Sequence, residues 1–352
     1  MKKQFVVKWI GLVIGLVAVG LLFMLPLDYY IKKPGDAYRA AEYIKVENKD
    51  ENDQGEFRFT TVAVMKATPF FYVLANFLPY QDVEEIGDVL QEEEDEEEYE
   101  IRQLKLMDNS QFNAISVAFQ KAKLPYTVRY DGIYVLNIIS GSAADGLLKP
   151  GDEIVEIDGV VVENLEQLGK RIDELGENDN LELVIKRNKK LLTKELTLKE
   201  IPKSNGKIGL GITYTESKSI QTEPFVKLNT EDIGGPSAGL MFTLEILNQL
   251  LDEDLTKGYV IAGTGTMNED GSVGRIGGID KKVVAAERAG AAYFLAPDDD
   301  ISEAVKKEYP DMLSNYEEAL EAVKKLDTTM EVVPIKTIDD ALEFLKSLQP
   351  KN

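Results

Sequence analysis

The chain has 352 residues and contains neither cysteine nor histidine. The absence of cysteine excludes disulfide bonds, thiolate zinc sites and thiol nucleophiles. The absence of histidine removes the commonest metal ligand and the usual general base of enzymes. Any catalysis must therefore depend on serine, threonine, lysine, tyrosine or carboxylate side chains, and we expect neither a cofactor nor a metal site.

Basic residues are scarce relative to acidic ones. The chain has 40 Lys and Arg residues against 62 Asp and Glu residues, which gives a formal net charge of −22. Such a chain repels nucleic-acid phosphates, and it shows no basic face with interleaved aromatic residues. The sequence also lacks the G-x-x-x-x-G-K-[ST] phosphate loop. We therefore expect no nucleic-acid partner and no bound nucleotide.

One long uncharged run lies near the N-terminus. Residues 9–27 carry no charged side chain, and as a helix they would span about 30 Å, the thickness of a bilayer's hydrocarbon core. Three lysines precede the run, so the positive-inside rule predicts a cytoplasmic tail at 1–8, a transmembrane signal anchor at 9–28 and an extracellular remainder. A cleaved signal peptide is the alternative, although no A-x-A type cleavage site follows the run.

The segment 29–129 is expected to be extracellular and close to the membrane. It contains the acidic run QEEEDEEEYE at 91–100. A dense block of like charges normally stays solvated, so we expect an exposed loop or helix end there. Weak calcium binding is the alternative, but the run lacks the spacing of an EF-hand loop.

Residues 130–200 are predicted to form a compact module rich in β-structure. Short β-rich runs are separated by turn sequences such as KPGD and IDG, and one amphipathic helix is expected at 165–175. The stretch SGSAADGLLKPGDEIVEIDGVVV closely resembles bacterial PDZ domains.

The PDZ resemblance implies a peptide-binding site. It makes Gly132, Ile133 and Tyr134 the loop that binds a ligand carboxylate, and an extended peptide would add as a strand beside residues 133–138. The alternative is a PDZ fold that serves only as a rigid spacer.

Residues 205–349 are predicted to form a further domain, because predicted strands alternate with predicted helices there. The expected fold class of the whole chain is therefore α+β, with an N-terminal transmembrane helix, the PDZ-like module and this C-terminal domain. Oligomerisation is left open by the sequence.

The stretch EDIGGPSAGLMF begins at Glu231 and runs into a helix predicted at 237–251. Gly235 permits a tight turn and Pro236 suits the first turn of a helix. Ser237 then lies at the helix N-terminus, where free backbone amides and the helix dipole favour negative charge. Taken alone, this pattern leaves open a helix cap, a phosphate cradle or a nucleophile.

A second motif, IAGTGTMNEDGSVGRIGGIDKKVVAAERAG, follows at 261–290. The two motifs together resemble the proteolytic domain of the Lon family, whose catalytic pair is a serine and a lysine. The resemblance implies that Ser237 is the nucleophile, that Lys282 is its base, and that Thr264 hydrogen-bonds the lysine.

The chemistry of the residues agrees with this resemblance. A serine hydroxyl needs a base, and a lysine can serve only when neutral, so its pKa must fall from about 10.4 toward 7 or 8 through desolvation. The apolar residues after Lys282 could exclude water from it. The neighbouring Lys281 lies about 100° round the helix and is expected to be a solvated surface lysine.

Two further roles are expected around the serine. Backbone amides of the turn formed by Gly235, Pro236 and Ser237 would bind the oxyanion. Asp232 would orient the loop or contact substrate, and a loop-capping carboxylate is the alternative.

The absent phosphate loop distinguishes the chain from Lon itself. A membrane anchor, a PDZ module and a Lon-type domain resemble the Lon-like, PDZ-containing surface proteases of Gram-positive bacteria. The resemblance implies an ATP-independent extracellular endopeptidase that cleaves secreted peptides or surface proteins, such as pheromone precursors, with the PDZ domain binding substrate. The alternatives are a catalytically inactive surface adaptor that binds extended peptides and a phosphate-binding enzyme.

Overall fold

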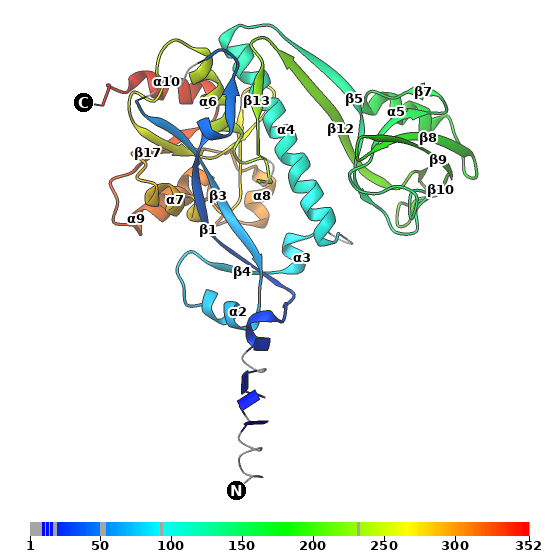
Figure 1. Cartoon of the computed structure of the whole chain (residues 1–352), viewed down its shortest axis with the longest axis horizontal. Coiled ribbons are helices and arrows are strands. Elements are labelled where there is room, and N and C mark those ends of the chain that lie inside the picture. The colour runs from blue at the N-terminus through cyan, green and yellow to red at the C-terminus, as the bar shows by residue number, and fades with distance from the viewer. Residues whose placement is uncertain are drawn as a thin grey trace.

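The computed structural model describes residues 9–10, 12–13, 15–16, 20–49, 54–91, 94–230 and 233–351. Two six-stranded sheets, each with its own hydrophobic core, dominate the described part of the chain and are joined by a long β-ribbon (Figure 1). The predicted mixture of helices and sheets is thus confirmed.

The first sheet combines strands from both ends of the chain, in the order β18-β17-β14-β3-β1-β4. Neighbours among β3, β14, β17 and β18 run parallel, whereas β1 is antiparallel to both β3 and β4. The strands are β1 (Tyr29–Arg39), β3 (Glu56–Lys66), β4 (Asp82–Glu85), β14 (Val260–Gly263), β17 (Tyr293–Pro297) and β18 (Glu331–Ile335). The segment 29–129 is therefore not a separate region, and the predicted domain start at 205 is wrong, because half of this sheet precedes it.

Helices cover both faces of the first sheet. Alternate side chains of a strand point to opposite faces. Accordingly Ile261 and Leu295 join the core that includes α4 (Glu96–Ala122), α6 (Gly239–Leu250) and α10 (Ile338–Ser347). Ala262 and Phe294 face the other core, with α7 (Ile279–Arg288) and α9 (Asn315–Lys324).

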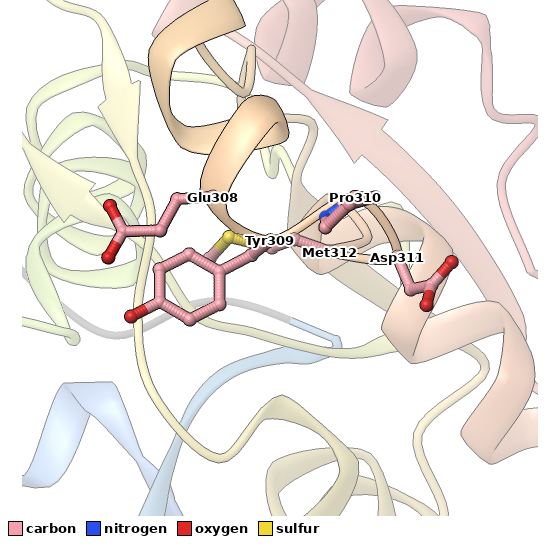
Figure 2. A pocket seen from close by; sticks show the side chains of 5 residues that line it. All are labelled: Glu308, Tyr309, Pro310, Asp311 and Met312. Atoms are coloured by element: carbon pink, nitrogen blue, oxygen red, sulfur yellow. The ribbon is translucent and has the colours of Figure 1, made fainter.

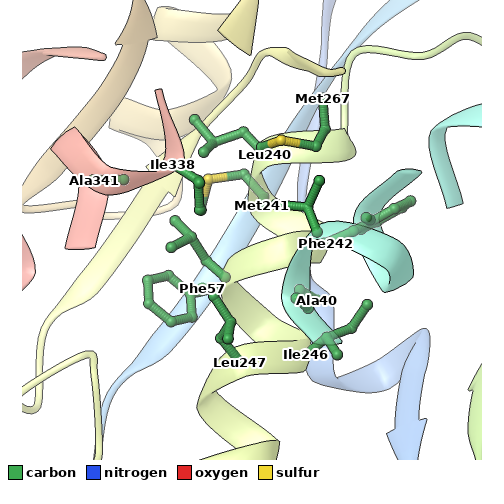
Figure 3. Close-up of a cluster of buried hydrophobic side chains, with 14 of the residues drawn as sticks. Ala40, Phe57, Leu240, Met241, Phe242, Ile246, Leu247, Met267, Ile338 and Ala341 are labelled. Carbon is green, nitrogen blue, oxygen red and sulfur yellow. The ribbon is translucent and has the colours of Figure 1, made fainter. Parts of the chain in front are cut away.

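The helix α6 is the centre of the larger core. All twelve of its residues are buried, including the polar Thr243, Glu245, Asn248 and Gln249. Figure 3 shows Leu247 of α6 close to Phe57 of β3, with Met241 and Phe242 on the same helix. The helix starts two residues later than predicted, because Ser237 and Ala238 lie in the turn before it.

The second sheet has the order β12-β5-β6-β8-β9, with β7 paired to β6. Its strands are β5 (Tyr126–Ile138), β6 (Glu153–Ile157), β7 (Val160–Val161), β8 (Asn180–Arg187), β9 (Lys190–Thr197) and β12 (Ile212–Thr222), and its helix is α5 (Leu165–Asp173). The predicted module at 130–200 matches most of this unit but omits β12.

The strands β5 and β12 form the ribbon between the two sheets. They pair from Tyr126 opposite Thr222 to Ile138 opposite Ile212. The PDZ-like unit is therefore inserted into the first domain, which the chain leaves along β5 and re-enters along β12 (Figure 1).

The long helix α4 lies between the two units (Figure 1). Asp95 caps it through a capping box with Glu98, so the second half of the acidic run forms its first turns, and the prediction of a helix end is confirmed. Glu94 departs from the expected solvation, because it is buried and paired with Arg102 at 2.6 and 2.8 Å. Within the described residues, no group of three or more acidic side chains has the arrangement of a metal site.

The N-terminal run is described only in part. Among the residues that the structure describes, no helix is both long and apolar enough to cross a bilayer. Residues 9–10, 12–13, 15–16 and 20–24 are helical, and positions 11, 14 and 17–19 of the predicted anchor at 9–28 lie outside the described residues.

The remaining elements are short. They are η1 (Ala40–Glu42), β2 (Ile44–Val46), α2 (Pro69–Ala75), α3 (Ile86–Val89), β10 (Lys199–Glu200), β11 (Ile208–Gly209), β13 (Val226–Leu228), β15 (Thr266–Met267), β16 (Val273–Gly274) and α8 (Glu303–Glu308).

Candidate active site

The first domain brings Ser237, Lys282 and Thr264 together. Ser237 lies in the turn before α6, Lys282 in the first turns of α7, and Thr264 directly after β14. The Lys282 Nζ atom lies 2.7 Å from Ser237 Oγ and 3.0 Å from Thr264 Oγ1. A third partner, the backbone carbonyl oxygen of Thr60 on β3, lies 2.9 Å from Nζ.

The direction of two of these hydrogen bonds is fixed. The carbonyl of Thr60 can only accept, and the hydroxyl of Thr264 donates its hydrogen to the Ser237 carbonyl at 2.9 Å. Lys282 must therefore donate to both. A neutral amine has two N–H donors and one lone pair, so in that state the lone pair is left for the hydroxyl hydrogen of Ser237.

The environment of Lys282 favours the neutral amine. The residue is 3% exposed, and burial lowers its pKa from 10.5 to about 7. Val283, Val284 and Ala285 beside it are buried as well. Among the described residues, no carboxylate lies within ion-pair distance of Nζ to counter this desolvation.

The turn that carries Ser237 is held from two sides. On one side, the Ser237 carbonyl accepts hydrogen bonds from the Gly265 amide at 2.8 Å and from the Thr264 hydroxyl. On the other side, α4 approaches so closely that a Cβ on Gly234 would lie 2.8 Å from that of Gln103. The serine is thus fixed between the end of β14 and α4.

The backbone groups near Ser237 differ from the predicted oxyanion site. The Gly235 amide already donates to the Gln103 carbonyl at 2.8 Å, and Pro236 has no N–H group. Neither can bind an oxyanion in this arrangement, so that part of the prediction is wrong. The amides of Ser237 and Ala238 have no acceptor within the described part of the chain, and they are the available donors at the start of α6.

Lys281 is also misplaced by the sequence prediction. It is 1% exposed rather than solvated, and it forms ion pairs with Asp82 of β4 and, at 3.1 Å, with Asp280. Burial opposes the charged form, but the hydrogen bond to Asp82 and the charge of Asp280 outweigh it and raise the pKa of Lys281. This lysine remains a cation.

One predicted residue is not tested by the structure, and one pocket lies elsewhere. Asp232 lies outside the described residues. A surface pocket at the end of α8 is lined by Glu308, Tyr309, Pro310, Asp311 and Met312, and it shares no residue with the Ser237 site (Figure 2).

The predicted peptide-binding residues of the PDZ-like unit lie inside its sheet. Gly132, Ile133 and Tyr134 belong to β5, which pairs with β12 on one side and β6 on the other. A peptide cannot add beside residues 133–135, which have backbone partners on both sides, and this part of the prediction is wrong. For residues 136–138 the binding of a peptide stays a prediction. Gly132 has φ 137°, and a Cβ there would lie 2.5 Å from the Ile154 carbonyl oxygen, so the glycine serves strand packing.

Three residues of the site were missed by sequence reasoning. Thr60 contributes only its carbonyl, and Gln103 accepts through its carbonyl, so neither leaves a side-chain motif. Ser110 on α4 donates its hydroxyl to the Pro236 carbonyl at 3.0 Å. All three precede the PDZ-like unit in sequence, far from the two motifs.

Comparisons with known proteins fit this arrangement. Residues 230–344 match the family model of the Lon protease (S16) C-terminal proteolytic domain, and residues 113–198 match that of the PDZ domain. These matches support a serine peptidase domain of the Lon type and a PDZ domain in one chain. Thr60 lies outside both matched ranges.

The relatives are much longer proteins. A Lon protease from Koribacter versatilis is 30% identical over 143 residues, which are 40% of this chain and 15% of that protein. The mitochondrial Lon protease homolog of Aspergillus fumigatus is 44% identical over 69 residues, which are 20% of this chain and 6% of that protein. The crystal structure of the PDZ domain of an SdrC-like protein from Listeria monocytogenes is 31% identical, covers 25% of this chain and 92% of that chain, and has a TM-score of 0.24.

Proposed function

We propose that the protein is a membrane-anchored endopeptidase in which Ser237 is the nucleophile and Lys282 the general base. The contact of 2.7 Å between Ser237 Oγ and the buried amine of Lys282 is the observation that carries the proposal. The chain has no phosphate loop, so cleavage is expected to be independent of ATP and limited to peptides and flexible segments.

In the first step, the neutral amine of Lys282 takes the hydroxyl proton of Ser237 as Oγ bonds to the carbonyl carbon of the substrate peptide. The carbonyl oxygen becomes an oxyanion and accepts hydrogen bonds from the Ser237 and Ala238 amides. The tetrahedral intermediate collapses, the C–N bond breaks, and the Lys282 ammonium returns its proton to the departing amine. An acyl-serine ester remains.

Water completes the reaction by the reverse of these proton transfers. Lys282, now neutral again, takes a proton from the attacking water, and the ester collapses to a carboxylic acid and the Ser237 hydroxyl. Throughout the cycle, Thr60 and Thr264 keep accepting from the amine, so the lysine does not rotate away from Oγ.

The test of this proposal is peptide hydrolysis by the purified full chain and by Ser237→Ala. The wild type is expected to cleave unfolded peptides without ATP, with a rate that rises with pH through about 7, since only the neutral lysine acts as a base. The variant is expected to lack this activity, and a serine-directed phosphonate should label only the wild type. Equal hydrolysis by both proteins would refute the proposal, and absence of labelling would favour an inactive adaptor.

The PDZ-like unit is proposed to bind the substrate along β12. This strand is an edge of its sheet, and among the described residues no strand pairs with its outer side. The start of α5 lies beside it, since the Leu165 amide is 3.3 Å from the Glu216 carboxylate. A peptide added to this edge would run with β12 toward the catalytic domain, where Lys218 pairs with Glu269 at 3.0 Å.

A lysine placed next to this edge tests the binding site. Leu165→Lys is expected to raise KM for long substrates and to leave kcat and the cleavage of short peptides unchanged. Leu191→Lys is the matched control, because Leu191 is an exposed residue on β9, at the opposite edge of the sheet. If both variants cleave long substrates like the wild type, the unit is a spacer.

The location outside the cell is part of the same proposal. It is supported by the uncharged run 9–27 and the lysines that precede it. Mass spectrometry of the peptides released by cells with the wild type or Ser237→Ala would identify the substrates. We propose secreted peptides or surface proteins, such as pheromone precursors.

A further inference from the structure

A second uncharged stretch lies between β3 and β4. Residues 67–81, ATPFFYVLANFLPYQ, contain no charged side chain, although the chain as a whole carries a net charge of −22. The charges that flank the stretch are both paired, since Lys66 binds Glu96 and Asp82 binds Lys281. The surface formed by residues 67–81 therefore carries no charge, and the charges at its two ends are neutralised by their partners.

The short helix α2 in this stretch is apolar on all sides but only half covered. Phe71 and Tyr72 pack on the small core that contains Ile31 and Ala75. On the other side, Phe70 is 39% and Val73 57% exposed, and Phe77, just after the helix, is 81% exposed. A helix that is apolar all round is normally buried, so its exposed side needs a partner.

The end of the N-terminal run lies against this helix. The Phe23 ring centroid is 4.4 Å from that of Phe70, and the Leu27 amide donates to the Ala67 carbonyl at 2.8 Å. Figure 1 shows α2 and the N-terminal run at the same end of the molecule. The run adds further exposed apolar side chains, namely Leu21, Leu22, Phe23, Met24 and Leu25.

We propose that residues 20–25 and 69–78 form one apolar end surface that inserts into the outer leaflet of a lipid bilayer. A protein partner would normally require hydrogen bonds at the rim of the interface, whereas hydrocarbon requires none. The lack of charge over 67–81 matches hydrocarbon, and Tyr29, Tyr72 and Tyr80 around it suit the level of the headgroups. A depth of about 5–10 Å would bury the exposed side of α2.

This surface is joined to the catalytic helix. Asp82 begins β4, which follows the stretch directly, and its partner Lys281 precedes Lys282 on α7. Insertion of the surface therefore holds the catalytic domain at a fixed height and orientation above the bilayer. The inference goes beyond the proposed function, since an anchor alone would leave the domain free to tumble.

The chain has no cysteine and one tryptophan, so two probes can be read separately. Phe77→Cys and Val160→Cys are labelled with an environment-sensitive dye in the full chain and reconstituted into phosphatidylcholine vesicles. Val160 is the control, because it is 59% exposed on β7 of the PDZ-like unit. Trp9 reports insertion of the N-terminal run through quenching by brominated lipid.

The dye at position 77 is expected to emit at shorter wavelength and to be quenched by nitroxide-labelled lipid, whereas the dye at 160 is quenched only by aqueous iodide. Iodide quenching at both positions, with Trp9 quenched by the brominated lipid, would refute insertion of the end surface but would still support the N-terminal anchor. Shielding of position 77 from both quenchers would show a protein partner and would also overturn it. Cleavage of a short peptide by the Phe77→Cys protein checks the proposed function independently.

Discussion

Two adjacent lysines of α7 lie in opposite surroundings. Lys281 and Lys282 are 1% and 3% exposed, yet the pKa of the first is raised and that of the second falls to about 7. The difference lies in their partners. Lys281 meets two carboxylates, whereas Lys282 meets two hydroxyls and a carbonyl, which accept hydrogen bonds but carry no charge. Burial alone therefore does not decide the charge of a lysine.

The largest expected effect separates the two lysines by activity. Lys282→Met should reduce kcat/KM at least about 10³-fold, because no other base lies within reach of Ser237 Oγ among the described residues. Lys281→Met should remain within about tenfold of the wild type, since its two carboxylates are partly exposed and can be solvated. Steady-state hydrolysis of one peptide by all three proteins measures this. Equal losses would mean that the two lysines act alike.

The next effect is on stability and depends on pH. Between pH 7 and 10.5 the unfolded chain binds a proton at Lys282 that the folded chain does not, so this lysine lowers the free energy of unfolding most at pH 7 and below. Lys282→Met removes that penalty. The free energy of unfolding of the variant should be higher than that of the wild type by a few kcal/mol near pH 7. This difference should shrink as the pH approaches 10.5. Urea unfolding at several pH values measures it, and a gain independent of pH would contradict the low pKa.

The smallest effect concerns the carboxylate partner of Lys281. Asp82→Asn leaves the buried ammonium with Asp280 alone and is expected to destabilise the fold by about 1–2 kcal/mol. Asp300→Asn is the control, because Asp300 is exposed and its partner Lys336 is half-exposed. It should leave the free energy of unfolding essentially unchanged. If both variants unfold alike in urea, the Lys281 pair contributes no more than a surface pair.

Side-chain chemistry was the part of the site that the sequence could predict. Ser237, Thr264 and Lys282 lie in two motifs that resemble those of the Lon proteolytic domain. That resemblance implied their roles, and the structure brings the three together. Partners that act through the backbone leave no such trace. The carbonyl of Thr60 reaches Lys282 only because β3 pairs with β14, which is a contact across about 200 residues of chain.

Features that depend on tertiary packing were also beyond the sequence. Lys281 looks like a surface residue on the helix periodicity, and only the position of β4 shows that Asp82 covers it. Similarly, Gly132 looks like part of a ligand loop until β6 is seen beside it. In both cases the residue that decides the environment, on β4 or β6, lies far from the motif in sequence, so the local pattern alone does not show it.

The insertion of the PDZ-like unit into the first domain has a consequence for biosynthesis. The strands β1 and β3 are translated first, but β14, the parallel neighbour of β3, emerges only after some 200 further residues. Pairings between such distant segments form late, whereas the inserted unit has a core of its own and needs no later part of the chain beyond β12. Ser237, Thr264 and Lys282 can therefore come together only after the inserted unit and α7 have been translated, long after β1 and β3.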